Sequence, residues 1–457
     1  MKRGILFFFL ILIHSTLSAY ADDTVLGGTG QTVYPIFDTN VKMMSEQVDI
    51  HVRDGKSYVQ CTFLFHNTGE TEKLLMGFPA YGTLPPREGR EAFDDDVGLY
   101  AFKSYIDEKE VGVEVRKGLQ QKGNNVDPLY YPNWYVWEME IKKGEIKKVV
   151  NSYWMHNTYD STGGETIQYV LKTGATWKGE IEYGKITIVF DDPVSPQNFS
   201  ILDYELYQSN KNVQVFIHPE DKSFIWEFYR LEPDFDIGLY RQEWQRRGIE
   251  VLLYQDYLPK EHKEGQHLRQ LGLAAIEAYE KGDYEKAMDA IKKANQYKES
   301  QNAEVASYAL EVANLLDYYR GMILKQQGDY KGAAYYLKLN GLSEDYNLYE
   351  LANVYRQAGE LDQYIQTLKK IIRRENGQNS LRLWGLGEIN RLPARIKESY
   401  ELMQLPSAEA PITKDQSEIQ NESGVRGPKA FFFPSFLLFN GGVVILILVL
   451  YWNIKRR

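Results

Sequence analysis

The chain has 457 residues, of which 43% are hydrophobic and 25% charged, and its formal net charge is −10. This acidic balance disfavours nucleic-acid binding, because clusters of lysine and arginine bind a phosphate backbone. Cys61 is the only cysteine, so the chain forms no intramolecular disulfide. A large exported domain without disulfides is more typical of a bacterial or archaeal surface than of a eukaryotic secretory one.

Residues 1–21 predict a secretory signal peptide. Two basic residues precede the apolar run Ile5 to Ile13, and the small residues Ala19 and Ala21 stand before the expected cleavage site. The apolar run is shorter than the roughly 20 residues that a membrane-spanning helix needs. Removal of this segment takes two basic residues away and makes the formal net charge −12.

Residues 22–258 predict an extracytoplasmic β-rich domain, antiparallel and sandwich-like. Val48, Ile50 and Val52 alternate with polar residues, and Asp54-Gly55 is a favoured hairpin turn before the next alternating run. In that run Cys61 shares its face with apolar neighbours, which predicts a buried thiol. Further strands are expected at "YVWEMEI", "TIQYVL", "KITIVF" and "FIWEF".

Three phrases in this region carry a family resemblance: "VKMMSEQVDIHV", "TFLFHNTGETEKLLMGFP" and "YVLKTGATWKGEIEYGKITIVF". They resemble a family of exported bacterial domains that is classed as a domain of unknown function. The resemblance covers most of residues 30–240. It implies a surface or periplasmic setting and brings no catalytic residues with it.

Residues 259–403 predict a helical domain built from repeats. The turn Gly282-Asp283-Tyr284 is echoed by Gly328-Asp329-Tyr330, and a third turn is expected at Gly359. With small residues at helical spacing on both sides, the pattern resembles degenerate tetratricopeptide (TPR) repeats. The turn glycines are 46 and 31 residues apart, against about 34 in the family. We therefore expect a lengthened helix across residues 302–320 and a capping helix over residues 380–400. The alternative is an ordinary helical bundle.

The TPR resemblance also implies a peptide-binding groove, lined by the first helix of each pair. Counting back from each turn glycine assigns the groove to Arg269, Tyr279, Tyr318, Lys325, Tyr349, Asn353 and Arg356. Aromatic and basic side chains suit an acidic or extended peptide. Tyr349 stands where the family's carboxylate clamp has lysine, so recognition of a free C-terminus is not expected. The alternative is that these tyrosines pack the enlarged loop between the first and second copies.

The end of the chain predicts a membrane anchor. Residues 404–429 lack apolar periodicity and are expected to form a flexible stalk. Residues 430–454 carry no charge and are long enough to span a bilayer, and the basic residues 455–457 are expected to stay in the cytoplasm. The sequence thus predicts a single-pass type I membrane protein with the bulk of the chain outside the cell.

No motif in the sequence predicts catalysis, a metal or a cofactor. Lys172-Thr173-Gly174 matches a motif of penicillin-interacting enzymes, but the chain has no Ser-x-x-Lys, and it has no His-Glu-x-x-His for zinc. The run Asp94 to Asp96 is more typical of a solvated acidic surface than of a calcium loop.

The leading hypothesis is therefore a membrane-anchored extracytoplasmic scaffold that binds a protein or peptide of the cell envelope through its repeats. The alternative is a polysaccharide-binding protein or hydrolase of the envelope. It would act through the β-rich domain, by aromatic residues that stack on cell-wall glycan and by paired carboxylates such as Asp94 or Glu165.

Overall fold

The computed structural model describes residues 30–31, 34–35, 39–81, 99–117, 133–160, 163–171, 174, 177–208, 210–243, 253, 263–339, 347–373 and 379–404. The expected signal peptide, transmembrane segment and cytoplasmic tail lie outside these residues, as does all of the expected stalk except Gln404. Among the described helices, none is both long enough and apolar enough to cross a membrane.

The first part of the described chain is rich in strands. They are β1 (Gly30–Gln31), β2 (Tyr34–Pro35), β3 (Val41–Arg53), β4 (Lys56–Asn67), β5 (Glu72–Tyr81), β6 (Tyr100–Ile106), β7 (Lys109–Val111), β8 (Glu114–Lys117), β9 (Asn133–Ile141), β10 (Ile146–His156), β11 (Thr158–Tyr159), β12 (Glu165–Val170), β13 (Tyr183–Phe190), β14 (Phe199–Ile201), β15 (Val213–His218), β16 (Ser223–Arg230) and β17 (Ile237–Arg241). Two short helical turns, η2 (Pro196–Asn198) and α2 (Tyr204–Tyr207), lie beside β14 along the chain.

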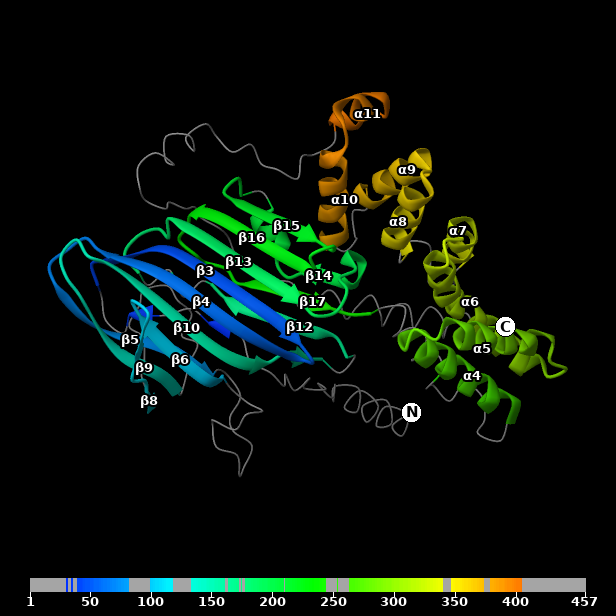
Figure 1. Ribbon diagram of the computed structural model, residues 1–457, viewed down its shortest axis with the longest axis horizontal. Coiled ribbons are helices and arrows are strands. Elements are labelled where there is room, and N and C mark those ends of the chain that lie inside the picture. Colours follow the sequence, from blue (N-terminus) through cyan, green and yellow to red (C-terminus); the bar gives the residue numbers. More distant parts are fainter. Residues whose placement is uncertain are drawn as a thin grey trace, which may run out of the picture.

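These strands form three sheets that share one hydrophobic core (Figure 1). The largest has the order β15-β16-β13-β3-β4-β10-β6-β7, and the smaller two are β1-β12-β17-β14, with β11 beside β12, and β2-β5-β9-β8. Aromatic contacts join the sheets: the rings of Phe78 on β5 and Tyr153 on β10 are 5.2 Å apart, and those of Phe199 on β14 and Phe224 on β16 are 4.9 Å apart. One face of the large sheet is therefore covered by the two smaller sheets.

The first hairpin forms as its sequence predicts. On β3 the side chains of Val48, Ile50 and Val52 are buried, and the residues between them are not. At the turn Asp54 and Gly55 have φ of 49° and 72°, values that suit glycine and aspartate in a tight hairpin. The expected burial of Cys61 on β4 is confirmed, since its side chain is fully buried.

The expectation of a purely antiparallel arrangement is wrong at two strand pairs. β3 runs parallel to β13, with Val48 opposite Ile186, and β1 runs parallel to β12. Parallel neighbours need a long crossover instead of a tight turn, and most of the β-rich region lies between β3 and β13 along the chain. Local alternation of residues indicates which face of a strand is buried, but it does not indicate which distant strand lies beside it.

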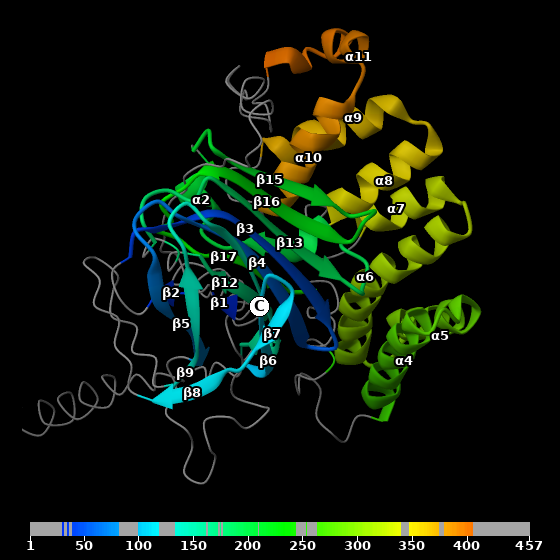
Figure 2. The same cartoon turned by 60° about the vertical axis from the view of Figure 1, so that its left-hand side comes forward.

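The second part of the described chain is helical and curves beside the sheets (Figure 2). Its helices are α4 (Lys263–Glu280), α5 (Tyr284–Gln296), η3 (Tyr297–Glu299), α6 (Ala303–Gln326), α7 (Tyr330–Leu339), α8 (Leu348–Ala358), α9 (Leu361–Ile372), α10 (Asn379–Arg391), α11 (Ala394–Ser399) and η5 (Leu402–Gln404). Consecutive helices pack as pairs, α4 with α5, α6 with α7 and α8 with α9. The lengthened helix that the turn spacing predicts is α6, with 24 residues.

The repeated Gly-Asp-Tyr phrase has a direct structural reason. Gly282 and Gly328 end their helices with φ of 74° and 81°, a conformation that costs other residues energy. The aspartate that follows begins the next helix: the Asp283 side chain accepts a hydrogen bond from the Lys286 backbone N–H at 3.1 Å, and Asp329 accepts one from Gly332 at 2.9 Å. Each phrase therefore ends one helix and begins the next.

The segment expected as one capping helix over residues 380–400 forms two helices, α10 and α11. α10 packs against α9, as a capping helix would, and also against β14, β15 and η2. The Asn379 side chain bonds the backbone N–H and C=O of Ile201 at 2.7 and 2.6 Å, and Ser380 donates to the carbonyl of Pro196 at 2.7 Å. Leu383 joins the core of the sheets. α10 therefore attaches the helical part to the β-rich part.

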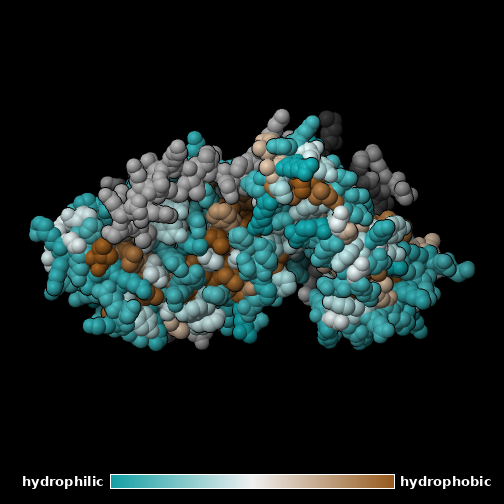
Figure 3. Space-filling model, turned by 45° about the horizontal axis from the view of Figure 1, so that its top comes forward, coloured by the Kyte–Doolittle hydropathy of each residue, from teal (hydrophilic) through white to brown (hydrophobic). Residues whose placement is uncertain are grey.

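The face of the molecule drawn in Figure 3 is mainly hydrophilic. Figure 3 shows hydrophobic residues gathered in separate patches within this surface. The large apolar side chains that are exposed among the described residues lie on both parts, and on the helical part they are Leu310, Tyr335, Leu339, Leu361 and Met403.

Candidate functional site

The predicted groove residues lie on α4, α6 and α8, the first helices of the three pairs. Arg269 and Tyr279 are on α4, Tyr318 and Lys325 on α6, and Tyr349, Asn353 and Arg356 on α8. The structure brings most of them into a connected set of contacts that runs from α4 to α8. Arg269 stands apart from this set, near Tyr308 on α6, where its positive charge opposes the rise in pKa that burial gives the tyrosine hydroxyl.

Tyrosines from α4 and α6 meet at the start of this set. The ring of Tyr319 is 5.1 Å from that of Tyr279 and 5.3 Å from that of Tyr318. Burial raises the pKa of the Tyr318 hydroxyl well above its usual value, and the negative charge of Glu350 raises it further. Tyr279 and Tyr318 are half-buried and pack against the hydrophobic clusters on both sides of them. They therefore join the first helix pair to the later ones.

Lys325 and Glu350 form a buried ion pair that links α6 to α8. The Lys325 Nζ is 2.7 Å from Glu350 Oε2, and the two side chains are 16% and 6% exposed. Such a pair is costly to break, because removal of one member leaves an uncompensated charge in a low-dielectric environment. Sequence reasoning identified Lys325 but missed Glu350, because nothing near either residue in the sequence indicates that they face each other.

A second charged cluster lies where α8, α9 and α10 meet. The Arg356 guanidinium contacts Glu388 Oε2 at 2.8 Å and donates to Asn353 Oδ1 at 2.8 Å. Tyr364 donates to the same Glu388 oxygen at 2.5 Å, and Arg391 is 2.8 Å from the other oxygen. Glu388 is 6% exposed, whereas the Arg356 side chain remains 52% exposed. Among the predicted groove residues, Arg356 therefore has the charged side chain that is most accessible to solvent.

Tyr349 connects α8 to its neighbours on two sides. Its ring lies 4.8 Å from that of Trp384 on α10 at an interplanar angle of 72°. Its backbone N–H donates to Gln197 Oε1 of η2 at 3.3 Å. Asn353 donates to the Tyr349 carbonyl at 3.1 Å, within the same helix. Both residues thus have contacts within the protein.

The junction between the two parts holds a small cluster of metal-binding residue types. One ligand atom from each of His218, Glu220 and Asp221, at the turn between β15 and β16, lies within 4.8 Å of the others. Arg391 of α10 approaches the same turn, at 3.4 Å from His218 Nδ1 and 3.8 Å from Glu220. A cation there would meet the positive charge of Arg391, so this arrangement favours a contact between the two parts over a metal site.

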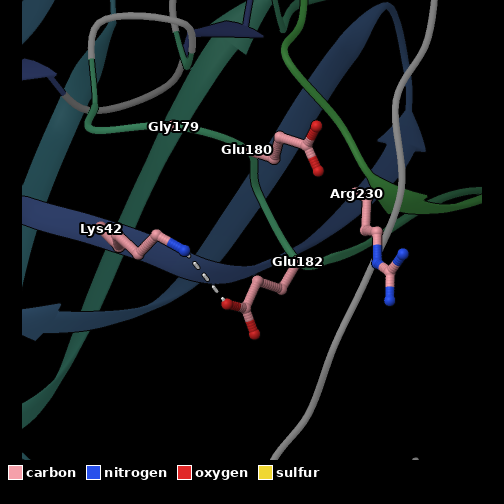
Figure 4. A pocket seen from close by; sticks show the side chains of 5 residues that line it. All are labelled: Lys42, Gly179, Glu180, Glu182 and Arg230. Carbon is pink, nitrogen blue, oxygen red and sulfur yellow. Dashed lines mark hydrogen bonds and ion pairs between the residues drawn. The ribbon is translucent and has the colours of Figure 1, made fainter.

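A pocket of about 350 Å³ lies near the starts of β3 and β13 (Figure 4). It is lined by Lys42, Gly179, Glu180, Glu182 and Arg230. The Lys42 side chain points toward Glu182, with its Nζ 3.4 Å from Oε1. Two acidic and two basic side chains balance one another in charge, so the pocket selects strongly neither for an anion nor for a cation.

The carboxylates of the hydrolase alternative have no catalytic arrangement that the structure describes. Asp94 lies outside the described residues. Glu165 accepts hydrogen bonds from Asn157 at 2.8 Å and from Tyr159 at 2.7 Å, and Arg241 lies 3.6 Å from its other oxygen. These contacts hold Glu165 within the strand network.

Comparisons with known proteins show no family. No protein-family model matches the chain, and no curated protein matches it. A solved structure of a candidate nutrient-binding protein from Legionella pneumophila is 20% identical, with a TM-score of 0.41, and the match covers 63% of this chain and 89% of that one. A likeness of this size carries no functional argument. Nothing in the comparisons or among the described residues indicates enzyme activity.

Proposed function

We propose that the chain is a membrane-anchored extracytoplasmic scaffold whose helical part is a short TPR-like array that binds an extended segment of an envelope protein. The observation that supports this proposal is the meeting of the first helices of successive pairs: side chains of α4, α6 and α8 are joined through Tyr279, Tyr318 and the ion pair of Lys325 with Glu350. Stacked helix pairs of this kind create extended surfaces that suit peptide segments.

The proposal also includes the location of the chain. The expected signal peptide and the uncharged segment at residues 430–454 support a location of the β-rich and helical parts outside the cell, with the β-rich part as a sandwich-like exported domain. A protease added to intact, wall-stripped cells should then digest all but a small membrane-protected fragment. Full protection of the chain would contradict this topology.

Arg356 offers the sharpest test of the binding surface, because its side chain is half-exposed and its loss leaves Glu388 bonded to Arg391 and Tyr364. We expect a photo-crosslinking amino acid at position 356 to capture an envelope protein from living cells. With the crosslinker at a neighbouring position instead, Arg356→Ala should lower capture of that protein at least about fivefold, equivalent to roughly 1 kcal/mol of binding free energy.

Arg395 is the matched control, since it is an exposed arginine on α11, away from α4, α6 and α8. Arg395→Ala removes the same charge and should leave capture unchanged. Equal capture by wild type and Arg356→Ala, with both chains folded, would assign the predicted groove to helix packing. Tyr318 and Lys325 are poorer probes, because their replacement disturbs packing between the helices as well as the surface.

A further inference from the structure

A row of ring side chains crosses the outer face of the eight-stranded sheet. His51, Tyr58, Trp154 and Tyr100 stand opposite one another on the adjacent strands β3, β4, β10 and β6 (Figure 1). On β3, β4 and β10 the residues before and after each ring are buried, whereas on β6 Leu99 is buried and Ala101 is exposed, at an irregularity in the pairing with β10. We call these four residues the aromatic stripe. His51 is exposed and the other three are half-buried.

Ring contacts lie within and beside the aromatic stripe. The rings of Tyr58 and Trp154 are 5.2 Å apart, and the Tyr100 ring is 5.8 Å from that of His156 on the neighbouring strand. The ammonium group of Lys56 lies 5.8 Å from the centre of the Tyr100 ring. Because adjacent strands are spaced by about 4.8 Å, four strands place the ends of the aromatic stripe roughly 14 Å apart. That length is enough for a short run of linked sugar rings.

A polar row lies directly beside the aromatic stripe. The row consists of residues that stand opposite one another on the same four strands: Asp49, Gln60, Ser152 and Lys103. The first three lie two residues along their strands from the aromatic stripe, and Lys103 lies three residues from Tyr100. Among the described residues, the side chains of Gln60 and Ser152 and the indole N–H of Trp154 make no hydrogen bond to another protein group. These groups can therefore donate to and accept from a ligand without losing an internal contact.

We propose that the aromatic stripe and its polar row bind an extended, uncharged polysaccharide. The apolar faces of sugar rings pack on aromatic side chains, and their hydroxyl groups need nearby amide, hydroxyl and carboxylate partners. The charged neighbours are of both signs, Asp49 on one side and Lys103 on the other, so the surface does not select a charged polymer. A peptide is less suited, because β4 and β10 are paired on both sides and offer no edge for an added strand.

This binding surface is separate from the helical face of the proposed scaffold. The longer described helices lie beside the large sheet at its β15 edge, where α10 contacts β15 (Figures 1 and 2). The aromatic stripe is built from β3, β4, β10 and β6, on the other side of β13 and β16 in the strand order. One surface can therefore be impaired without the other.

The test is affinity electrophoresis of the full chain, purified in a detergent without a sugar headgroup. The native gels contain neutral xylan, hydroxyethyl cellulose or glycol chitin, and a parallel gel contains none. At least one polysaccharide should retard wild type, and Trp154→Ala should raise the dissociation constant about tenfold or more. Tyr100→Ala, at the end of the aromatic stripe, should weaken binding less, and it serves as the second variant if Trp154→Ala misfolds.

Phe216→Ala is the matched control. Phe216 is a half-buried aromatic residue on the edge strand β15, where it stacks with His218 and not with the aromatic stripe. Its replacement should leave retardation at the wild-type level. The proposal would be overturned if no polysaccharide retarded wild type, or if the Trp154 and Tyr100 variants were retarded as strongly as wild type. It would also be overturned if Phe216→Ala lost as much retardation as Trp154→Ala. Binding of peptides to the aromatic stripe without any glycan binding would also overturn it.

Discussion

Replacement of Asn379 by alanine tests how the helical part is attached to the sheets. Among the described strands, β14 lies at the edge of its sheet and pairs with β17 alone. The Asn379 side chain bonds the Ile201 backbone on the other side through both its amide oxygen and its amide nitrogen, at 2.7 and 2.6 Å. One side chain at the start of α10 thus takes the position of a neighbouring strand.

The expected effect follows from these two bonds. Ile201 is 2% exposed, so Asn379→Ala leaves a buried N–H and a buried C=O with little access to water. A buried polar group without a hydrogen bond costs about 1–3 kcal/mol. Local opening of β14 should become easier by at least about 1 kcal/mol, which corresponds to a loss of roughly fivefold or more in protection against hydrogen exchange at the Ile201 amide.

Hydrogen–deuterium exchange with mass spectrometry measures this loss on peptides that cover residues 196–202 and 379–391. Exchange should rise in both peptides, while peptides from α4 and α5 stay unchanged. Asn295→Ala is the control, because its side chain donates only to the Ile291 carbonyl within α5, at 2.9 Å. Wild-type protection at residues 196–202 in Asn379→Ala would refute this account of the attachment.

Two further predictions concern the two parts separately. A polar maleimide should label Cys61 only after the protein unfolds. Mild alkali should not speed this labelling, because burial, and to a smaller extent the charge of Glu46, raises the pKa of the thiol. Rapid labelling of the native protein would show the register of β4 to be wrong. Gly328→Ala should lower the free energy of unfolding by about 1–2 kcal/mol, since φ is 81° at this turn. The control is Gly387→Ala in α10, where the added methyl group meets open space, so this change should be neutral or stabilising by up to about 1 kcal/mol. Chemical denaturation measures both variants, and equal effects would contradict the role given to the turn.

Local features of the fold are readable from the sequence because they depend on near neighbours. Alternation identified the buried face of β3 and β4, and the repeated turn glycines located the helix ends at Gly282 and Gly328, which have positive φ. The excess spacing between these glycines identified a lengthened helix, which the structure shows as α6. Each of these inferences rests on a period or a dihedral preference that a few residues determine.

Long-range features were not readable in the same way. Ser380 lies 184 residues from Pro196, and its hydroxyl donates to the Pro196 carbonyl in a buried contact. Neither the helical pattern of α10 nor the strand pattern of β14 indicates the other. The aromatic stripe has the same character: alternation puts Tyr58 on the face of β4 opposite that of Cys61, but only the register of β4 with β10 places it opposite Trp154. Periodicity shows which face of an element is buried and not what covers it.

The ion pairs also change what the groove residues imply about a partner. Lys325 and Arg356 predict, as single residues, a surface that attracts acidic peptides. In the structure each is already paired with a carboxylate that is less than 10% exposed, Lys325 with Glu350 and Arg356 with Glu388. An acidic peptide would have to compete with these buried carboxylates. If it drew Lys325 away, Glu350 would lose its positive partner at a cost of several kcal/mol, whereas Glu388 would keep Arg391. The tyrosines and the exposed half of Arg356 are not subject to this cost. Recognition through this face therefore favours an extended segment with apolar or aromatic anchors over a strongly acidic one.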